Sequence, residues 1–165
     1  MDAEEKRRCT KCKRDLPISY FYLLQKDGTK RLSRCKECTR VWRRSWSQTP
    51  EGKYVWLLHK GRRHKVTISK EDFTEWYKKQ PRKCAYCGIA EVDLQRATDP
   101  LIKSTYQLSV DRINNSRGYE KGNLVLCCLR CNQVKGEFLT HEEMRWVGQQ
   151  IIRKRWENDG IPIIN

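Results

Sequence analysis

Paired cysteines constrain this sequence more than any other feature. Eight of its nine cysteines fall into four Cys-x-x-Cys pairs, which begin at Cys9, Cys35, Cys84 and Cys128. The chain starts with MDAEEKRR, without the apolar stretch of a secretory signal, so we expect the thiols to stay reduced in an intracellular, cytoplasmic compartment. In a reducing compartment, cysteine pairs of this spacing are typical of structural zinc sites.

Two such pairs supply the four thiolates of a tetrahedral zinc site, so the sequence predicts two structural Zn²⁺ ions. The predicted ligands are Cys9, Cys12, Cys35 and Cys38 for the first ion, and Cys84, Cys87, Cys128 and Cys131 for the second. Cys127 lacks the spacing to Cys131 and is expected to be a buried thiol outside both sites. A redox Cys-x-x-Cys is the alternative interpretation, but such a motif normally occurs alone. Structural zinc contributes on the order of 10–16 kcal/mol to folding, so we expect a chelator to unfold the second module.

The cysteine pairs divide the chain into three expected parts. These are an N-terminal zinc module over residues 1–48, a basic helical connector with a short strand over 49–82, and a second zinc module with a C-terminal helix over 83–165. In the first part we expect a strand at residues 20–24 and a helix capped by Thr39. In the connector, Pro50 begins one helix and Ser69 caps another. The inward residues of these two helices are expected to be Tyr54, Leu57, Leu58, Phe73, Trp76 and Tyr77.

The third part has the pattern of a hairpin followed by helices. Strands are expected at residues 108–113 and 123–127, with a turn-rich loop between them. A helix should begin near Cys131, and Thr140 followed by Glu143 predicts a capping box for a last helix that reaches Trp156. The sequence therefore indicates a small α+β protein.

The charge of the chain favours a polyanionic partner. Lys and Arg number 35 and Asp and Glu 20, which gives a net charge of +15. Residues 30–65 hold 12 basic and 2 acidic residues, a local charge of +10. A local excess of this size suits a nucleic acid, although a solvated basic face is the alternative. No apolar run approaches the 18 or so residues of a membrane span, which excludes a transmembrane protein.

Arginines in and around this basic segment are the predicted DNA contacts, because Arg binds phosphates and reads guanine in the major groove. They are Arg31, Arg34, Arg40, Arg43, Arg44, Arg62 and Arg63. Four aromatic residues interleave with them, and we expect most of these to lie in the core. The aromatics are Trp42, Trp46, Tyr54 and Trp56.

Two polar residues of the third part have the chemistry of a divalent metal site. Asp111 ends the first expected strand, and Asn132 lies on the following helix. Both offer oxygen, the ligand that Mg²⁺ prefers, and an ion held by few protein ligands keeps positions for a phosphate. Two other interpretations exist: Asp111 pairs with Arg112 or Arg117, and Asn132 caps a helix.

The stretch from Leu108 to Gly136 resembles the HNH endonucleases. The matching residues are Asp111, Ile113, Gly118, Asn123, Leu124, Cys128, Cys131, Asn132, Lys135 and Gly136, and the upstream Cys84-x-x-Cys87-Gly88 belongs to the same pattern. The resemblance implies a ββα-metal module, in which two antiparallel strands and a helix hold one catalytic Mg²⁺ or Mn²⁺. Most HNH enzymes have a His after the Asp as general base. Here the residue is Arg112, which cannot accept a proton.

The departure at Arg112 is shared by a branch of the family. Over nearly its full length the chain resembles the Pac-type, rare-cutting HNH restriction endonucleases, through Asp111-Arg112, Gly118-Tyr119 and a His64 that precedes a short strand. The resemblance implies that Tyr119 and His64 replace the missing base, with Asp111, Arg112 and Asn123 completing the catalytic set. Whether Tyr119 is nucleophile, base or water-positioner stays open. Tyr119 as a packed turn residue and His64 as a surface histidine are the alternatives.

The function implied by the resemblance is sequence-specific cleavage of double-stranded DNA by a restriction-type endonuclease. The branch further implies a homodimer on a palindromic site, in a bacterial or phage-infected cell. Two alternatives remain at this point: a phage or mobile-element HNH enzyme that nicks or homes, and a non-catalytic zinc DNA-binding module.

Overall fold

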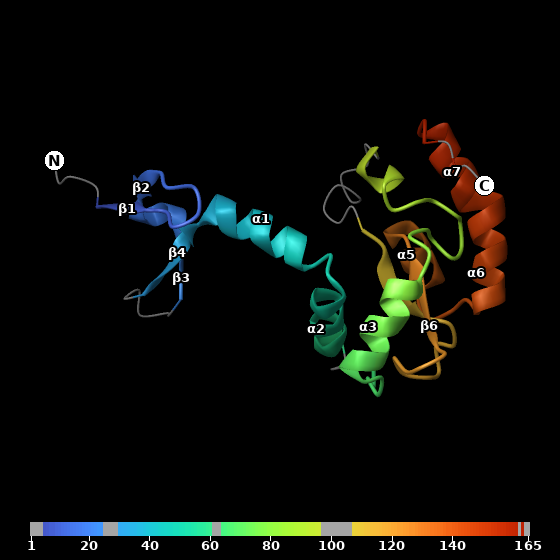
Figure 1. Ribbon diagram of the computed structural model, residues 1–165. Coiled ribbons are helices and arrows are strands. Elements are labelled where there is room, and N and C mark those ends of the chain that lie inside the picture. Colours follow the sequence, from blue (N-terminus) through green and yellow to red (C-terminus); the bar gives the residue numbers. More distant parts are fainter. Residues whose placement is uncertain (1–4, 25–29, 61–63, 97–106, 162, 164–165) are drawn as a thin grey trace. The chain divides into compact units, whose positions relative to one another are not determined.

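The structure consists of two compact units, Met1–Thr49 and Pro50–Asn165 (Figure 1). It is a computed structural model that describes residues 5–24, 30–60, 64–96, 107–161 and 163. Within these ranges no helix combines the length and the apolar character needed to cross a membrane.

The first unit is made of two short hairpins and one helix. Its elements are β1 (Lys6–Arg8), β2 (Asp15–Pro17), η1 (Ile18–Tyr20), β3 (Phe21–Leu23), β4 (Arg31–Cys35) and α1 (Lys36–Trp46). β1 pairs antiparallel with β2, and β3 pairs antiparallel with β4. Its buried core is Cys9, Phe21 and Cys35, with further cysteines packed against it. The strand predicted at residues 20–24 is confirmed as β3.

The start of α1 differs from the prediction. The N-cap is Cys35, whose sulfur accepts a hydrogen bond from the backbone N–H of Cys38 at 3.5 Å. Thr39 lies inside the helix, and its hydroxyl donates to the carbonyl of Arg34 at 3.4 Å. The prediction of Thr39 as the cap was wrong because the cysteine turn itself satisfies the first N–H groups of the helix.

Most aromatics of the basic segment lie on the surface, contrary to the prediction. Trp42 and Trp46 on α1 are 48% and 37% exposed and stack on each other with ring centroids 6.2 Å apart. Trp56 is also exposed, while Tyr54 is half-buried. For Trp42 and Trp46 the prediction failed because the core of the first unit, which consists of cysteines and Phe21, is too small to cover a helix face.

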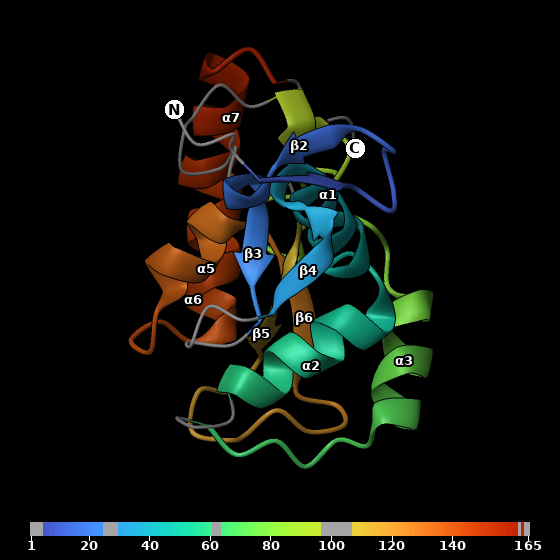
Figure 2. The same ribbon diagram turned by 90° about the vertical axis from the view of Figure 1, so that its left-hand side faces the viewer.

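The second unit packs helices around one antiparallel hairpin. Its elements are α2 (Pro50–Lys60), α3 (Lys70–Lys79), η2 (Asp93–Arg96), β5 (Ser109–Arg112), β6 (Leu124–Cys127), α5 (Leu129–Lys135), α6 (His141–Val147), η3 (Gly148–Ile152) and α7 (Arg153–Asn158). β5 pairs with β6 in the register Asp111↔Val125 and Arg112↔Leu124. Figures 1 and 2 show α3 and α6 on opposite sides of this hairpin.

Helix starts in the second unit follow the predicted caps. Pro50 begins α2, the Ser69 hydroxyl accepts from the Asp72 N–H at 3.0 Å, and Thr140 forms a capping box with Glu143. The inner faces of α2 and α3 bury Leu57, Phe73 and Tyr77 in the core of this unit, with Tyr54 and Trp76 packed against it. The prediction for Leu58 was wrong, because it points outward and is 47% exposed.

The last helix continues to Trp156 as predicted but contains a π-helical turn, η3. A side chain at Gly148 would place its Cβ 2.7 Å from the carbonyl group of Tyr86. Glycine at this position therefore allows the helix to approach the Cys84–Cys87 turn closely, at the point where the helix widens.

Candidate functional site

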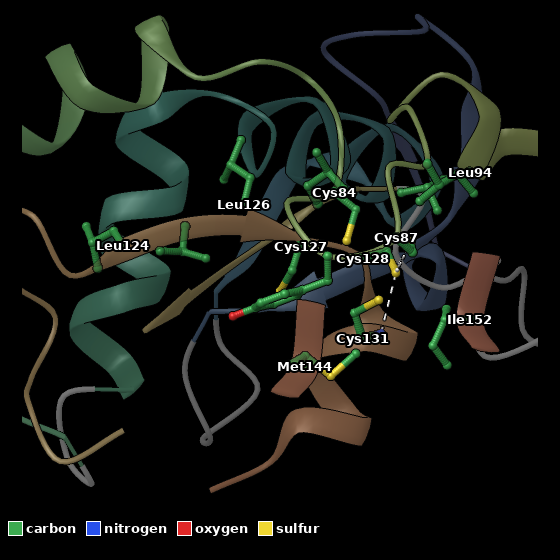
Figure 3. Close-up of a cluster of buried hydrophobic side chains, with 14 of the residues drawn as sticks. Cys84, Cys87, Leu94, Leu124, Leu126, Cys127, Cys128, Cys131, Met144 and Ile152 are labelled. Carbon is green, nitrogen blue, oxygen red and sulfur yellow. Dashed lines mark hydrogen bonds between the residues drawn. The ribbon is translucent and has the colours of Figure 1, made fainter. Parts of the chain in front are cut away.

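Both predicted sets of four cysteines converge in the structure. Within each set the four sulfurs lie within 4.8 Å of one another. The Sγ atoms of Cys12 and Cys35 are 4.0 Å apart, and those of Cys87 and Cys128 are 3.7 Å apart. A tetrahedron with Zn–S bonds of about 2.3 Å has edges of about 3.8 Å, so both sets can hold zinc. Figure 3 shows the second set in the core, with Cys127 buried nearby but outside the cluster, as predicted.

Hydrogen bonds to two sulfurs of the first site, those of Cys9 and Cys12, favour the thiolate form. The backbone N–H of Cys35 donates to the Cys9 sulfur at 3.3 Å, and this contact lowers the pKa of Cys9 to about 6. The Arg14 guanidinium donates to the Cys12 sulfur at 3.4 Å and lowers the pKa of that thiol. Zinc binds thiolates, so these contacts prepare the site for the metal.

Asp111 is a buried carboxylate with two partners, a hydroxyl that donates a hydrogen bond and a lysine amine. It lies on β5 and is 7% exposed. Its Oδ2 accepts from the Tyr86 hydroxyl at 2.7 Å and faces the amine of buried Lys135 at 3.4 Å. Among the ion pairs of the described residues, Arg112 and Arg117 approach Glu137 and Glu120 and not Asp111, so the ion-pair alternative from the sequence does not hold. Burial raises the pKa of Tyr86, so its hydroxyl keeps the proton that it donates.

Asn132 lies within α5, which packs against β5. The N-cap of α5 is Cys128, so the alternative role of Asn132 as a cap does not hold. Among the residues that the structure describes, neither the Asn132 amide nor Oδ1 of Asp111 makes a hydrogen bond. Both side chains carry hard oxygen atoms, the donor type that Mg²⁺ and Mn²⁺ prefer, and they lie on elements that pack against each other.

The loop between β5 and β6 is shaped by Asn123 and Arg112. The Asn123 amide donates to the carbonyls of Gly118 and Asn114 at 2.8 and 3.1 Å, and its oxygen accepts from the Asn114 N–H at 2.8 Å. Arg112 Nη1 donates to the carbonyls of Asn115 and Arg117 at 2.7 and 3.1 Å. Asn123, which was expected in the catalytic set, therefore fixes the backbone of the loop that carries Tyr119.

Backbone pairing brings His64 to Tyr119. The Tyr119 N–H donates to the carbonyl of Lys65 at 2.8 Å, and the Tyr119 carbonyl accepts from Thr67 at 3.0 Å. A side chain at Gly118 would place its Cβ 2.2 Å from the Lys65 oxygen, so only glycine allows this approach. The rings of His64 and Tyr119 meet edge to face with centroids 6.2 Å apart.

Arg112 also packs against this tyrosine. Its Cζ lies 5.6 Å from the centroid of the Tyr119 ring. Tyr119 is 3% exposed, and burial raises its pKa, while the charge of Arg112 acts in the opposite direction. In the structure burial outweighs the arginine, so Tyr119 is a neutral phenol at neutral pH.

Glu137 joins the site, although the sequence contained no sign of it. Its Oε1 lies 3.2 Å from His64 Nε2 and 3.8 Å from Arg112 Nη2. Residues 113–116 and 137–142 line an adjacent open groove of about 740 Å³. Phe138 in this groove is 95% exposed. Tyr86 and Lys135 also contact the site, although the sequence analysis gave them no role. The signals that could have found them are the position of Tyr86 between two cysteines of the second cluster and the match of Lys135-Gly136 to the HNH motif.

The predicted DNA-contacting arginines gather in the first unit. Arg31 and Arg34 lie on β4, and Arg40, Arg43 and Arg44 on α1. Arg31 donates to the Phe21 carbonyl at 3.0 Å, so part of its charge supports the β3–β4 hairpin. The remaining two predicted contacts, Arg62 and Arg63, lie outside the described residues.

The antiparallel hairpin, the following helix and the four-cysteine cluster that links this helix to an upstream turn resemble the ββα-metal module of HNH endonucleases. The protein is similar to one solved structure, that of the rare-cutting HNH restriction endonuclease PacI, with a TM-score of 0.55 and 28% sequence identity. It covers 94% of this chain and 99% of that chain. No family model matches the sequence, and no curated protein matches it. The likeness to HNH endonucleases of the PacI type is therefore confirmed, as is the small α+β fold with two four-cysteine clusters.

Proposed function

We propose that this protein is a sequence-specific, restriction-type endonuclease that hydrolyses double-stranded DNA with Mg²⁺ or Mn²⁺. The observation that carries the proposal is the convergence of Arg112, Tyr119 and His64 at one end of the hairpin that bears Asp111. The similarity to the HNH restriction endonuclease PacI supports it.

Asp111 and Asn132 are the proposed ligands of the divalent ion. When bound, such an ion polarises the scissile phosphate and stabilises the leaving oxygen. Tyr86 and Lys135 hold Oδ2 of the carboxylate, so the second oxygen of Asp111 is left for the ion together with the amide oxygen of Asn132.

His64 is the proposed general base. An imidazole titrates near pH 6.5 and accepts a proton at neutral pH, which the guanidinium of Arg112 cannot do. His64 takes the proton of the attacking water. Tyr119, which burial keeps neutral, orients that water through its hydroxyl.

Arg112 is the proposed phosphate clamp. Its Nη1 is used by the loop backbone, and its Nη2 lies near the carboxylate of Glu137. The same carboxylate oxygen lies 3.2 Å from His64 Nε2, so Arg112 and His64 face one oxygen atom. A DNA phosphate would take the place of that carboxylate and gain a charge-assisted hydrogen bond from Arg112.

DNA binding is assigned to the basic residues of the first unit and to Arg62 and Arg63. If these residues neutralise 6–10 phosphates, the affinity for DNA should fall by about 10³–10⁵ when the salt concentration rises from 50 to 200 mM. We further propose a homodimer on a palindromic site, in which each subunit cuts one strand. A reducing, intracellular compartment is part of the proposal, because zinc sites made of thiolates favour it.

Incubation of plasmid DNA with the purified protein and Mg²⁺ tests the proposal. Discrete linear fragments are expected. Nicked circles would favour a nicking or homing HNH enzyme instead, and unchanged plasmid would favour a non-catalytic zinc DNA-binding module. Sequencing the ends of the fragments then gives the recognised bases.

Substitutions test the catalytic assignment. His64→Ala should lower the cleavage rate by about 10²–10⁴, the range of general-base catalysis. His59→Ala is the matched control, because His59 is an exposed histidine on α2 outside the site. If Tyr119→Phe and His64→Ala both cleave at the wild-type rate while Asp111→Ala is inactive, the assignment of the base and of Tyr119 is wrong.

A further inference from the structure

Tyr86 connects the second cysteine cluster to the carboxylate of the candidate divalent-metal site. It lies inside the Cys84-x-x-Cys87 turn, between two zinc ligands, and its side chain is fully buried. The Tyr86 hydroxyl donates to Oδ2 of Asp111 at 2.7 Å. One tyrosine therefore spans the space between the two sites.

Contacts with the last helix fix the backbone of Tyr86. The Gln149 amide donates to the Tyr86 carbonyl at 2.6 Å, and Gly148 leaves room for that carbonyl where a Cβ would lie 2.7 Å away. The ring of His141, at the start of the same helix, lies 5.4 Å from the Tyr86 ring. Because these contacts hold the Tyr86 backbone and the side chain is buried, the position of the hydroxyl is fixed.

The hydroxyl selects which oxygen of Asp111 is left for a ligand. Oδ2 already has the Tyr86 hydroxyl and, at 3.4 Å, the Lys135 amine, while Oδ1 makes no hydrogen bond among the described residues. A carboxylate that is held through one oxygen presents the other in a fixed direction. Residues that orient a metal ligand in this way typically change metal affinity by about 10–100-fold when they are removed.

We propose that Tyr86 is a positioning residue, which directs Oδ1 of Asp111 towards a divalent cation and makes that cation site depend on the second zinc site. The proposal rests on the metal site of the proposed function. The Cys-x-x-Cys spacing requires no particular residue at position 86, and the hairpin does not require one there either. The proposal therefore gives Tyr86 a role of its own.

Titration of the zinc-loaded protein with Mn²⁺ alone, followed by calorimetry, tests the proposal without DNA. Tyr86→Phe keeps the ring and removes only the hydroxyl, and should raise the Kd for Mn²⁺ about 10–100-fold while the zinc content stays at the wild-type value. The matched control is Tyr77→Phe, because Tyr77 is another buried tyrosine and its hydroxyl does not contact Asp111. The control should bind Mn²⁺ as the wild type does.

Cleavage assays add a measurement that a folding defect does not reproduce. With Tyr86→Phe the Mn²⁺ concentration for half-maximal cleavage should rise by the same factor, and excess Mn²⁺ should restore the rate. A variant that fails to recover with excess metal contradicts a positioning role. If Tyr86→Phe binds Mn²⁺ like the wild type while Asp111→Ala does not bind it, this inference is wrong and the metal site stands. If the wild-type protein binds no Mn²⁺, the metal site and the inference both fail.

Discussion

The two units of this protein use their cysteine clusters differently. Among the described residues of the first unit the buried core is three side chains, of which Cys9 and Cys35 belong to the four-cysteine cluster. In the second unit the core contains 22 buried apolar side chains among the described residues, and only four of them belong to the cysteine cluster. The same tetrathiolate chemistry is thus most of the core in one unit and one corner of it in the other.

This difference assigns the metal two roles. A few buried side chains cannot offset the loss of chain entropy on folding, so we expect a unit as small as the first one to depend on a metal for its stability. The second unit has a larger apolar core, so we expect zinc there mainly to fix the turn that carries Tyr86. The difference also revises our expectation from sequence, in which a chelator unfolds the second module: the first unit should be the more sensitive one.

The largest expected effect is the loss of the first unit when one ligand is removed. Cys12→Ser deletes a half-buried thiolate that is not part of the three-residue core. Since a structural zinc contributes on the order of 10 kcal/mol, the whole unit should unfold. Hydrogen exchange with mass spectrometry should show unprotected amides in β1–β4 and α1, with β5 and β6 still protected.

Cys87→Ser is the matched variant in the second unit. It should release the second zinc and lower stability, yet leave a cooperative unfolding transition, because the apolar core persists. If the β1–β4 amides stay protected in Cys12→Ser, or if the second unit unfolds completely in Cys87→Ser, then the first unit is not the more metal-dependent of the two.

The next effect concerns the apolar core of the second unit. Phe73 on α3 is fully buried and packs against Tyr54 and Tyr77, with ring centroids 5.5 and 5.8 Å away. Phe73→Ala should lower the free energy of unfolding by about 3–5 kcal/mol, the usual cost of deleting a buried phenyl ring. Urea unfolding measures this loss, and the zinc content of the first unit should not change.

Leu58→Ala is the control for that substitution. Leu58 is on α2 in the same unit but is 47% exposed, so its truncation should change stability by less than about 0.5 kcal/mol. Equal losses for Phe73→Ala and Leu58→Ala would mean that burial in this unit does not determine its stability.

The cysteine pairs and the HNH motif predicted both four-cysteine clusters and the hairpin with its helix, and local capping patterns predicted the caps at Ser69 and Thr140. These features depend on spacing and on residues close together in the chain, which sequence records directly. The partners of Asp111 could not be predicted, because Tyr86 and Lys135 are 25 and 24 positions away and no local pattern pairs them.

The exposed pair Trp42 and Trp46 shows a second limit of sequence reasoning. An apolar helix face indicates burial only when the unit has a core large enough to cover it, and the first unit does not. Thr39 failed as a cap for a related reason, since the zinc-binding turn at Cys35 replaced the usual hydroxyl.

The smallest predicted effect is a pH dependence that only a large core can produce. Lys53 on α2 is 8% exposed, and its amine donates to the carbonyl of Leu108 at 2.8 Å. Burial lowers the pKa of Lys53 from 10.5 to about 8, although the charge of Glu91 acts in the opposite direction. The unfolded chain keeps this proton up to pH 10.5, so between pH 8 and 10.5 the unfolded state binds more protons and stability rises with pH.

For these two pKa values the gain between pH 7 and 9 is about 1 kcal/mol. Urea unfolding of the wild type and of Lys53→Met at both pH values isolates this contribution, because the other titrating groups are common to both proteins. The difference in unfolding free energy should move in favour of the wild type as the pH rises. A difference that stays constant, or that moves towards the variant, would mean that the Lys53 amine is not held in a low-dielectric core, and the contrast between the two units would then be smaller than their buried residues indicate.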